Sequence, residues 1–247
     1  MKILETFDIT RINDLVTRAR QTPSSPDEQE EIEGWSKSVA DPTELLSLFL
    51  PLRLREGFVL RAYQYCSGGN GNAIVFAVPA GSDLPEPNEC RPSAPDYPEA
   101  YSPVPAPPNA HDDFMSFVEG DDTPWSYLLA SLLARELWEF GAMWHGCEWS
   151  THTILGTDPF TKPVGTSDAP LDGPTSPVDM WQWDEHAPAD WRPVVGSASG
   201  RTVVRFYTYT GLGCEQIVRH TDTYGKRGYV FEPDAVAIGH GQGGFVF

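Results

Sequence analysis

The stretch that most constrains the fold is residues 121–147, because its apolar side chains follow the spacing of an α-helix. One face carries Trp125, Leu128, Leu129, Leu132, Leu133, Leu137, Phe140 and Trp144. Other apolar side chains leave only a thin polar stripe, formed by Ser131, Arg135, Glu136 and Glu139. Thr123 is suited to cap the first turn, and Pro124 to the first helical position, where no backbone donor is needed. A helix that is apolar around most of its girth is normally buried, so the sequence predicts a central helix.

The segments before this helix change from helical to strand-like character. Apolar periodicity and flanking prolines predict helices over residues 8–20, 27–35 and 43–50. Two runs rich in β-branched and aromatic residues then flank a Gly/Asn turn, which predicts a β-hairpin with strands at 58–65 and 73–78.

The segments after the helix are predicted to be mainly strands. Residues 148–155 have the pattern of a strand that returns along the helix. Alternating or continuous apolar runs between glycine breaks then predict strands at 201–210, 216–223, 228–231, 235–239 and 243–247. Helices first and strands last favour an α+β fold with N-terminal helices, a β-hairpin, one central buried helix and a C-terminal antiparallel β-meander.

One domain is predicted for residues 1–247, because neither the hairpin nor the central helix has enough apolar partners by itself. Ten prolines lie between Pro79 and Pro108, so a Pro-rich loop is expected at 79–110. A second long loop, rich in Gly, Pro, Thr and Asp, is expected at 156–200.

The charge of the chain is strongly negative and unevenly distributed. The net charge is −18, and residues 57–200 hold twenty acidic and five basic side chains. Such a field repels nucleic acid and anionic membranes and favours a basic protein partner, although solubility alone also explains it. No segment has the pattern of a signal peptide or a membrane span, so a cytoplasmic location is expected.

The cysteine pattern predicts neither a disulfide framework nor a metal centre. Four cysteines are widely spaced, with no C-x-x-C pair, and nothing in the sequence predicts a cofactor.

One candidate catalytic cluster lies where the central helix is expected to end. His145, Cys147 and His152 could supply a thiolate nucleophile with a histidine base, or three metal ligands. However, a helix C-terminus and the adjacent Glu148 both disfavour a thiolate, and the spacing matches no standard zinc motif. A structural thiol is the alternative interpretation.

A second candidate pairs a histidine with a carboxylate on a predicted strand. Alternation places His220 and Asp222 on the same face, where they could transfer a proton. An ordinary polar sheet face explains the same pattern. The glycine-rich residues 239–244 are expected either to approach a ligand or to form a turn.

A third candidate is a tryptophan-rich segment flanked by acidic residues. Tryptophan beside carboxylates is typical of a binding hot spot for a basic partner, and it also suits stacking on a sugar ring. The proposed anchors and acidic rim are Trp181, Trp183, Asp184, Glu185, Asp190 and Trp191. In the alternative interpretation, Trp181 and Trp183 belong to an edge strand that packs on the core, and Trp191 covers it.

Taken together, these features predict a non-enzymatic acidic protein that binds a basic protein, of the inhibitor, immunity or antitoxin kind. A small hydrolase or transferase that uses the Cys/His residues is one alternative. A tryptophan-lined carbohydrate-binding protein is the other. The oligomeric state is left open by the sequence.

Overall fold

The computed structural model describes residues 1–21, 33–92, 104–161 and 173–246. It contains 25% helix and 37% strand, which confirms the predicted α+β class. The chain divides into two compact units. The first unit comprises Met1–Thr17, Asp122–Leu132 and Glu148–Phe247, and the second comprises Arg18–Asp121 and Leu133–Cys147. Helices α1 (Ile9–Gln21) and α3 (Pro124–Trp138) each contribute residues to both units. A single domain stays a prediction.

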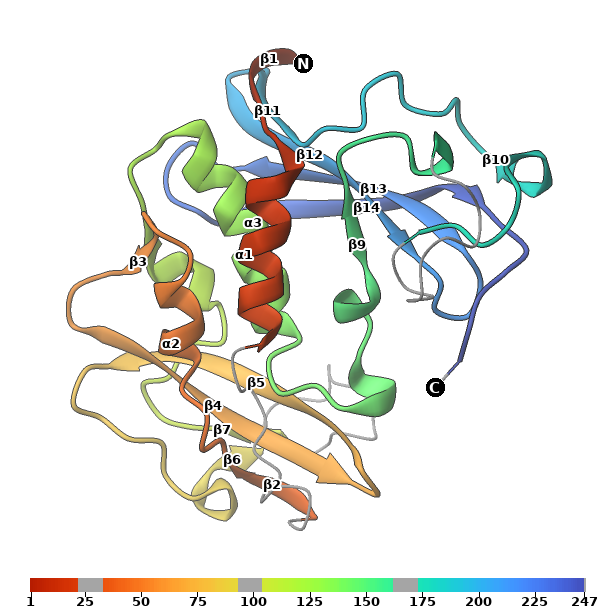
Figure 1. Cartoon of the computed structure of the whole chain (residues 1–247). Coiled ribbons are helices and arrows are strands. Elements are labelled where there is room, and N and C mark those ends of the chain that lie inside the picture. The colour runs from red at the N-terminus through yellow and green to blue at the C-terminus, as the bar shows by residue number, and fades with distance from the viewer. Residues whose placement is uncertain (22–32, 93–103, 162–172, 247) are drawn as a thin grey trace. The chain divides into compact units, whose positions relative to one another are not determined.

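The first unit is built on a seven-stranded antiparallel sheet in the described part of the chain, whose strands β11–β14 are blue in Figure 1. The strand order is β1-β11-β12-β13-β14-β10, and β9 also pairs with β12. The strands are β1 (Lys2–Thr6), β9 (Thr153–Leu155), β10 (Gln182–Trp183), β11 (Val194–Ala198), β12 (Arg201–Thr210), β13 (Gln216–Tyr224) and β14 (Phe231–His240). Strands β12, β13 and β14 follow one another in sequence and in space and form the predicted meander, and β11 adds a strand that was not predicted.

Both faces of this meander carry buried side chains. In β12, Phe206 and Thr208 point to one face and Tyr207 and Tyr209 to the other, and all four are buried. The register places Phe206 opposite His220. An aromatic core on the Tyr209 face contains Leu155, Trp181, Trp191, Tyr207, Tyr209, Ile217 and Ile238.

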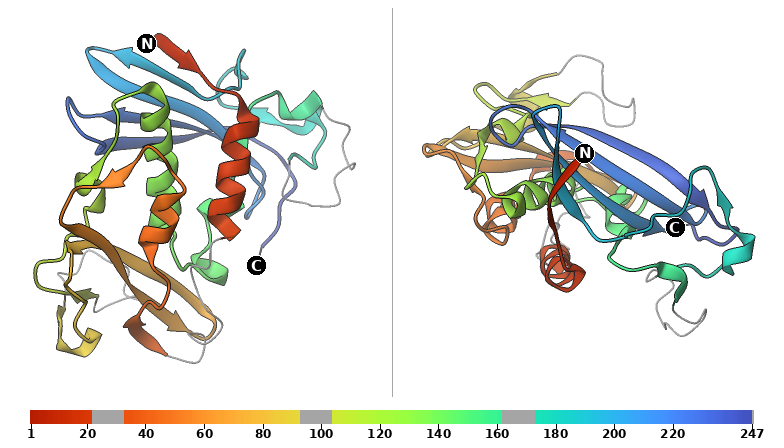
Figure 2. Two further views of the ribbon diagram at one scale, coloured as in Figure 1. Left: turned by 60° about the vertical axis from the view of Figure 1, so that its left-hand side comes forward. Right: turned by 90° about the horizontal axis from the view of Figure 1, so that it is seen from above.

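The second unit is built on the predicted β-hairpin, shown in orange in Figure 2. Strands β4 (Phe58–Ser67) and β5 (Asn70–Pro79) pair along their full length, and β2 (Gly34–Lys37) pairs with β4. Gly68 and Gly69 have φ values of 56° and 81°, the left-handed conformations that a two-residue hairpin turn requires.

Short elements complete the second unit. Two small strand pairs join β3 (Arg53–Leu54) to β8 (Val118–Glu119) and β6 (Arg91–Pro92) to β7 (Pro105–Ala106). The remaining elements are α2 (Pro42–Ser47) and the 3-10 helices η2 (Pro87–Glu89), η4 (Phe114–Phe117) and η5 (Trp144–Gly146). Asp41 caps α2 by accepting a 2.8 Å hydrogen bond from the Thr43 backbone N–H.

The central helix α3 begins as the sequence predicts and is more deeply buried than expected. The Thr123 hydroxyl accepts a 3.3 Å hydrogen bond from the Ser126 backbone N–H, which caps the first turn. The polar stripe is also buried, because Ser131, Arg135 and Glu136 are each less than a tenth exposed.

Truncation of Leu133 should reveal the contribution of this helix to stability. Leu133 is fully buried, so Leu133→Ala should lower the free energy of unfolding by about 2–5 kcal/mol, through lost burial and the cavity left behind. Urea denaturation monitored by circular dichroism measures the change. Trp138→Ala, at a position that is 47% exposed on the same helix, is the control and should cost much less. Equal losses in the two variants would contradict the central placement of α3.

The structure differs from the sequence prediction in several segments. Strands β1 and β11 were not predicted, and β14 is one continuous strand where two were expected. Residues 243–246 form no regular strand, although Phe245 makes an isolated bridge with Leu212. Most of the predicted helix at 27–35 lies outside the described residues, and its last two residues belong to β2.

The two predicted loops contain short ordered elements where they are described. The Pro-rich loop at 79–110 holds η2, β6 and β7. The loop at 156–200 holds η7 (Pro159–Thr161), η8 (Val178–Met180), β10 and β11. Residues 93–103 and 162–172 of these loops lie outside the described part of the chain.

Candidate functional site

The second unit contains an open cavity of about 430 Å³, here called the acidic pocket. It combines an apolar floor, one exposed tryptophan and two exposed carboxylates. The residues that line it are Asn72, Ala73, Ile74, Val75, Asp112, Asp113, Phe114, Leu137 and Trp138. None of these nine described residues is basic. Neither the cavity nor its residues were singled out by the sequence, because the lining comes from three separate segments.

Strand β5 supplies the floor, and backbone pairing attaches the end of α3 to it. The Ala73 N–H donates to the Phe140 carbonyl at 3.1 Å, and Gly71 and Met143 form an isolated antiparallel bridge. The buried Gln64 side chain also donates to the Gly141 carbonyl at 2.7 Å. These bonds fix the last turn of α3, and therefore Trp138, beside the floor.

The two carboxylates lie on a segment that is also paired with β5. His111 and Ala77 exchange two backbone hydrogen bonds of 2.9 and 3.0 Å, immediately before Asp112. The Ser116 hydroxyl donates to Asp113 Oδ2 at 2.7 Å and orients that carboxylate. Asp112 makes no hydrogen bond or ion pair with any other described residue, and its side chain is exposed.

The electrostatic character of the pocket is negative. Both carboxylates are exposed, and the C-terminal end of α3 adds the partial negative charge of its carbonyl groups. Trp138, on the last turn of α3, is 47% exposed and gives the pocket an aromatic wall. Such a site suits a cationic group attached to an apolar stem.

A second exposed tryptophan follows soon after α3 in the chain. Trp144 is 61% exposed and has φ of +47°, a conformation that bulky side chains rarely adopt. It follows Met143, whose backbone pairs with Gly71 next to the pocket floor. Strained backbone and exposed large aromatic side chains are both enriched at binding sites.

The sequence candidates His145, Cys147 and His152 are divided between the two units. His145 is exposed on η5, and Cys147, which follows η5, is half-buried; both belong to the second unit. His152 belongs to the first unit and is buried there. A shared catalytic or metal-binding role of the three residues stays a prediction.

The structure brings together His152 and His220, which the sequence assigned to two different clusters. The Thr208 hydroxyl lies 2.7 Å from His152 Nδ1 and 2.9 Å from His220 Nε2. A hydroxyl has one proton, so with neutral rings one histidine accepts from Thr208 and the other donates to it. Asp222, two residues along β13, is fully buried. Thr208 was missed by the sequence analysis, because only the strand register reveals it.

Aromatic rings enclose this His152–Thr208–His220 cluster. The Trp149 ring stacks on His152 with centroids 5.5 Å apart, and Phe206 stacks on His220 at 4.7 Å. All the side chains involved are buried, so the hydroxyl and both imidazoles are shielded from solvent. The arrangement is that of a hydrogen-bonded core network rather than an open catalytic centre.

The tryptophans of the third sequence candidate pack inside the first unit. Trp181 and Trp191 are each 6% exposed, and Trp183 packs partly buried against the same aromatic core. Phe160 makes edge contacts with Trp181 at 5.2 Å and with Trp183 at 6.0 Å. This placement agrees with the alternative interpretation, in which an edge strand packs on the core and Trp191 covers it.

The acidic residues near these tryptophans have basic partners within the chain. Asp184 lies 2.9 Å from His240 Nε2, Glu185 pairs with Arg219, and Asp190 pairs with Arg192 at 2.7 Å. The hydrogen bonds from Arg192 lower the pKa of Asp190 to about 2. Glu185 and Asp190 therefore each pair with an arginine and Asp184 bonds with a histidine, whereas Asp112 and Asp113 have no basic partner among the described residues.

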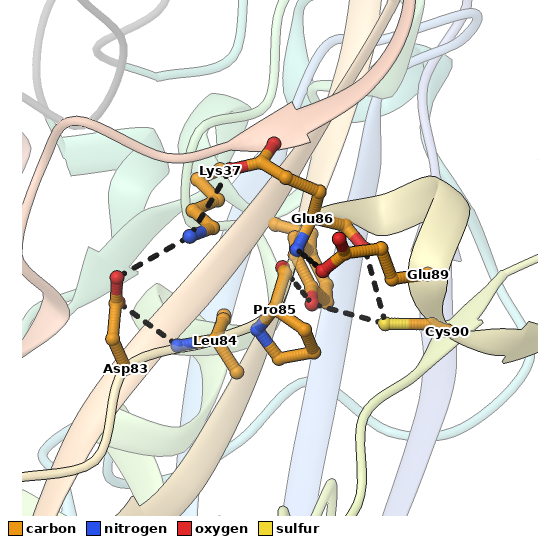
Figure 3. Close-up of polar contacts among 8 residues, drawn as sticks. Lys37, Asp83, Leu84, Pro85, Glu86, Glu89 and Cys90 are labelled. Carbon is orange, nitrogen blue, oxygen red and sulfur yellow. Dashed lines mark hydrogen bonds and ion pairs between the residues drawn. The ribbon is translucent and has the colours of Figure 1, made fainter.

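Another polar cluster in the second unit anchors the segment that precedes β6 (Figure 3). The Lys37 ammonium lies 3.3 Å from Asp83 and 3.2 Å from Glu86, and the bond with Glu86 is the main reason that the pKa of Lys37 is raised. The Tyr63 hydroxyl donates to the Pro85 carbonyl at 2.7 Å and lies 3.2 Å from Cys90 Sγ. Burial raises the pKa of Tyr63. These groups satisfy one another, so the cluster serves as a structural clamp.

A buried carboxylate in the first unit organises the glycine-rich residues 239–244. Glu215 is fully buried and accepts hydrogen bonds from backbone or side-chain groups of Thr175, Ser176, Tyr209 and Gly243. A Cβ atom at residue 241 would lie 2.6 Å from Glu215 Oε2, so only glycine fits there. Residues 241 and 243 therefore lie close to Glu215 of the same chain, and the approach of residues 239–244 to a ligand stays a prediction.

Two further features, a metal site and a membrane-spanning helix, are not found in the described residues. No group of three or more His, Cys, Asp or Glu side chains there is arranged to hold a metal ion. No helix within the same residues has the length and apolar content needed to cross a bilayer.

Comparisons with known proteins give no relative: no family description matches the chain, and neither a curated protein nor a solved structure shows significant similarity to it.

Proposed function

We propose that this chain is a non-enzymatic binding protein that recognises a basic protein partner in the cytoplasm, in the manner of an inhibitor, immunity protein or antitoxin. The observation that carries the proposal is the acidic pocket, where two exposed carboxylates and an exposed tryptophan meet without any basic lining residue. The partner surface proposed from the sequence therefore moves from the Trp181–Trp191 segment to the second unit.

The charge distribution supports the same conclusion. The residues of the second unit include nineteen acidic and eight basic side chains, a net charge of −11, against −7 for the first unit. Clustered charge of one sign speeds the encounter with a partner of the opposite sign and selects against partners of like sign. Exposed Trp138 and Trp144 provide the apolar contact area that charge alone lacks.

The alternatives proposed from the sequence are less well supported. The His152–Thr208–His220 cluster is buried, which disfavours a hydrolase or transferase reaction there. A carbohydrate could stack on Trp138, but a neutral sugar would gain nothing from the net negative charge of the pocket. Carbohydrate binding is therefore the second candidate, and it predicts binding that is insensitive to salt.

The proposal predicts a basic partner whose capture depends on both salt and the acidic pocket. We expect the immobilised protein to retain a basic protein from its native lysate at low salt, and to release it as ionic strength rises. The variant Asp112→Asn/Asp113→Asn should retain much less of it, because asparagine keeps the shape of aspartate and removes its charge. Quantitative mass spectrometry of the retained proteins measures the difference.

The matched control removes two carboxylate charges at residues that already have basic side chains as partners within the chain. Asp184→Asn/Glu185→Asn changes two carboxylates that pair with His240 and Arg219, and it should leave capture close to that of the wild type. Equal losses in both double variants would indicate a non-specific charge effect. Capture of no basic protein at any ionic strength would refute the proposal, and salt-independent binding on a glycan array would favour the carbohydrate alternative.

A further inference from the structure

We infer that the acidic pocket is a receptor for one arginine side chain of the partner, an assignment that rests on the proposed function and makes it more specific. A cavity of about 430 Å³ can hold individual side chains, whereas a protein–protein interface covers a much larger surface, so the pocket would form one part of a larger contact. The few energetically dominant residues of a partner typically insert into such pockets.

The carboxylate oxygens match the donors of a guanidinium group. Asp113 uses Oδ2 to accept from Ser116, which leaves its Oδ1 available. Asp112 makes no hydrogen bond or ion pair with another described residue, so both of its oxygens are available. Three acceptor oxygens on adjacent residues suit the planar fork of N–H donors in arginine, which a lysine ammonium cannot span in the same way.

The remaining walls suit the rest of an arginine side chain. The flat face of a guanidinium stacks favourably on an aromatic ring, and Trp138 lines the pocket with nearly half of its surface exposed. Ile74, which is only partly buried, offers an apolar surface for the methylene groups of the stem. The C-terminal end of α3 adds a favourable field for a cation.

The charge of the pocket excludes other ligand classes. Two carboxylates without a basic neighbour in the lining repel phosphates and carboxylates. A purely apolar ligand would strip water from both carboxylates without replacing their hydrogen bonds, which is costly. A planar cation with an apolar stem satisfies all the walls at once.

The test compares three small probes that differ in their terminal group, with one additional methylene group in the lysine stem. N-acetyl-arginine amide, N-acetyl-lysine amide and N-acetyl-citrulline amide are titrated into the intact chain labelled with ¹⁵N, and binding is followed by chemical-shift changes. Citrulline keeps the planar shape of arginine and lacks its charge. We expect the arginine probe to bind about tenfold more tightly than citrulline, the difference that one charge-assisted pairing supplies, and more tightly than lysine.

Variants then assign the binding to the pocket. Asp112→Asn/Asp113→Asn and Trp138→Ala should each weaken the arginine probe by about tenfold, whereas Asp184→Asn/Glu185→Asn should leave it unchanged. Circular dichroism establishes that each variant is folded, and the isosteric aspartate-to-asparagine change keeps the test valid if Trp138→Ala is not. Equal binding of arginine and citrulline, or binding that none of the pocket variants alters, would overturn the inference.

The outcome separates this inference from the proposed function. A basic partner that is captured normally by the pocket variants, and is not displaced by the arginine probe, would leave the proposed function standing and refute the arginine site. Probe binding that is lost in the pocket variants, with no basic protein captured by the wild type, would support the arginine site and refute the proposed function.

Discussion

Truncating Trp181 or Trp191, two buried tryptophans of the first unit, is expected to destabilise the fold rather than to weaken binding selectively. Trp181→Ala and Trp191→Ala should each lower the free energy of unfolding by about 3–5 kcal/mol, the usual cost of removing a large aromatic side chain from a core. Both rings are 6% exposed. Trp191 packs edge-on against Tyr207 with centroids 5.7 Å apart, and Trp181 contacts Phe160 at 5.2 Å.

A conservative variant distinguishes loss of packing from loss of a polar contact. The indole N–H of Trp181 has no hydrogen-bond partner among the described residues, so Trp181→Phe keeps most of the packing and sacrifices no such bond. It should cost clearly less than Trp181→Ala. Guanidinium denaturation followed by fluorescence gives the free energies of unfolding of Trp181→Ala, Trp191→Ala and Trp181→Phe. Stability unchanged in Trp181→Ala and Trp191→Ala, with partner binding lost, would instead restore these rings as partner anchors.

The sequence pattern of residues 181–191 fits two different structures. Tryptophan alternating with acidic residues is typical both of a binding surface and of an edge strand whose alternate side chains are buried. The pairing of β10 with β14 decides between them, since it places Trp183 opposite Gly239 and leaves Asp184 beside His240. Neither contact can be derived from local sequence, because the partners lie more than fifty residues away.

Local signals were sufficient where a segment determines its own structure. The central helix has a cap, a proline at its first position and a continuous apolar pattern, and α3 begins at the predicted residue. The hairpin of β4 and β5 was predicted because its two-glycine turn fixes the register of both strands. Strand β1 was missed because it is exposed along most of its length and pairs with β11, which is far away in sequence.

The acidic pocket could not be predicted from the sequence for a related reason. The acidic pocket joins residues near positions 73, 113 and 138, and these meet only through the bonds that attach two separate segments to β5. Asp112 and Asp113 belong to no recognisable motif in the sequence. Their one distinguishing property, exposed charge without a basic neighbour in the pocket, exists only after folding.

Replacing Glu215 should produce a loss of stability as large as that expected for the tryptophans. Glu215→Ala should lower the free energy of unfolding by roughly 3–5 kcal/mol, because the backbone N–H groups of Thr175, Ser176 and Gly243 would lose a buried acceptor. The hydroxyl of Tyr209, which also donates to Glu215 at 3.0 Å, would lose its partner as well. Thermal unfolding followed by calorimetry measures the effect.

The pH dependence of this effect follows from the pKa of Glu215. Burial raises that pKa, but the hydrogen bonds from Ser176, Thr175 and Tyr209 outweigh burial, so the pKa in the folded state lies below the ordinary value of 4.5. A carboxyl whose pKa is lowered by folding contributes stability that is fully present above the unfolded value and is lost as pH falls through the folded value. Acid should therefore weaken the wild type.

Glu215→Gln isolates the charge of the carboxylate from its shape. Glutamine cannot titrate, and its amide N–H₂ would face donors that need an acceptor, so the variant should be less stable than the wild type at neutral pH. The stability difference between the two should stay constant above about pH 5 and shrink as pH falls below the unfolded pKa of about 4.5. A difference that does not depend on pH would mean that folding leaves the pKa of Glu215 unchanged, and a difference that grows as pH falls would mean that folding raises it. Either result would contradict a carboxylate held in its charged form by these hydrogen bonds.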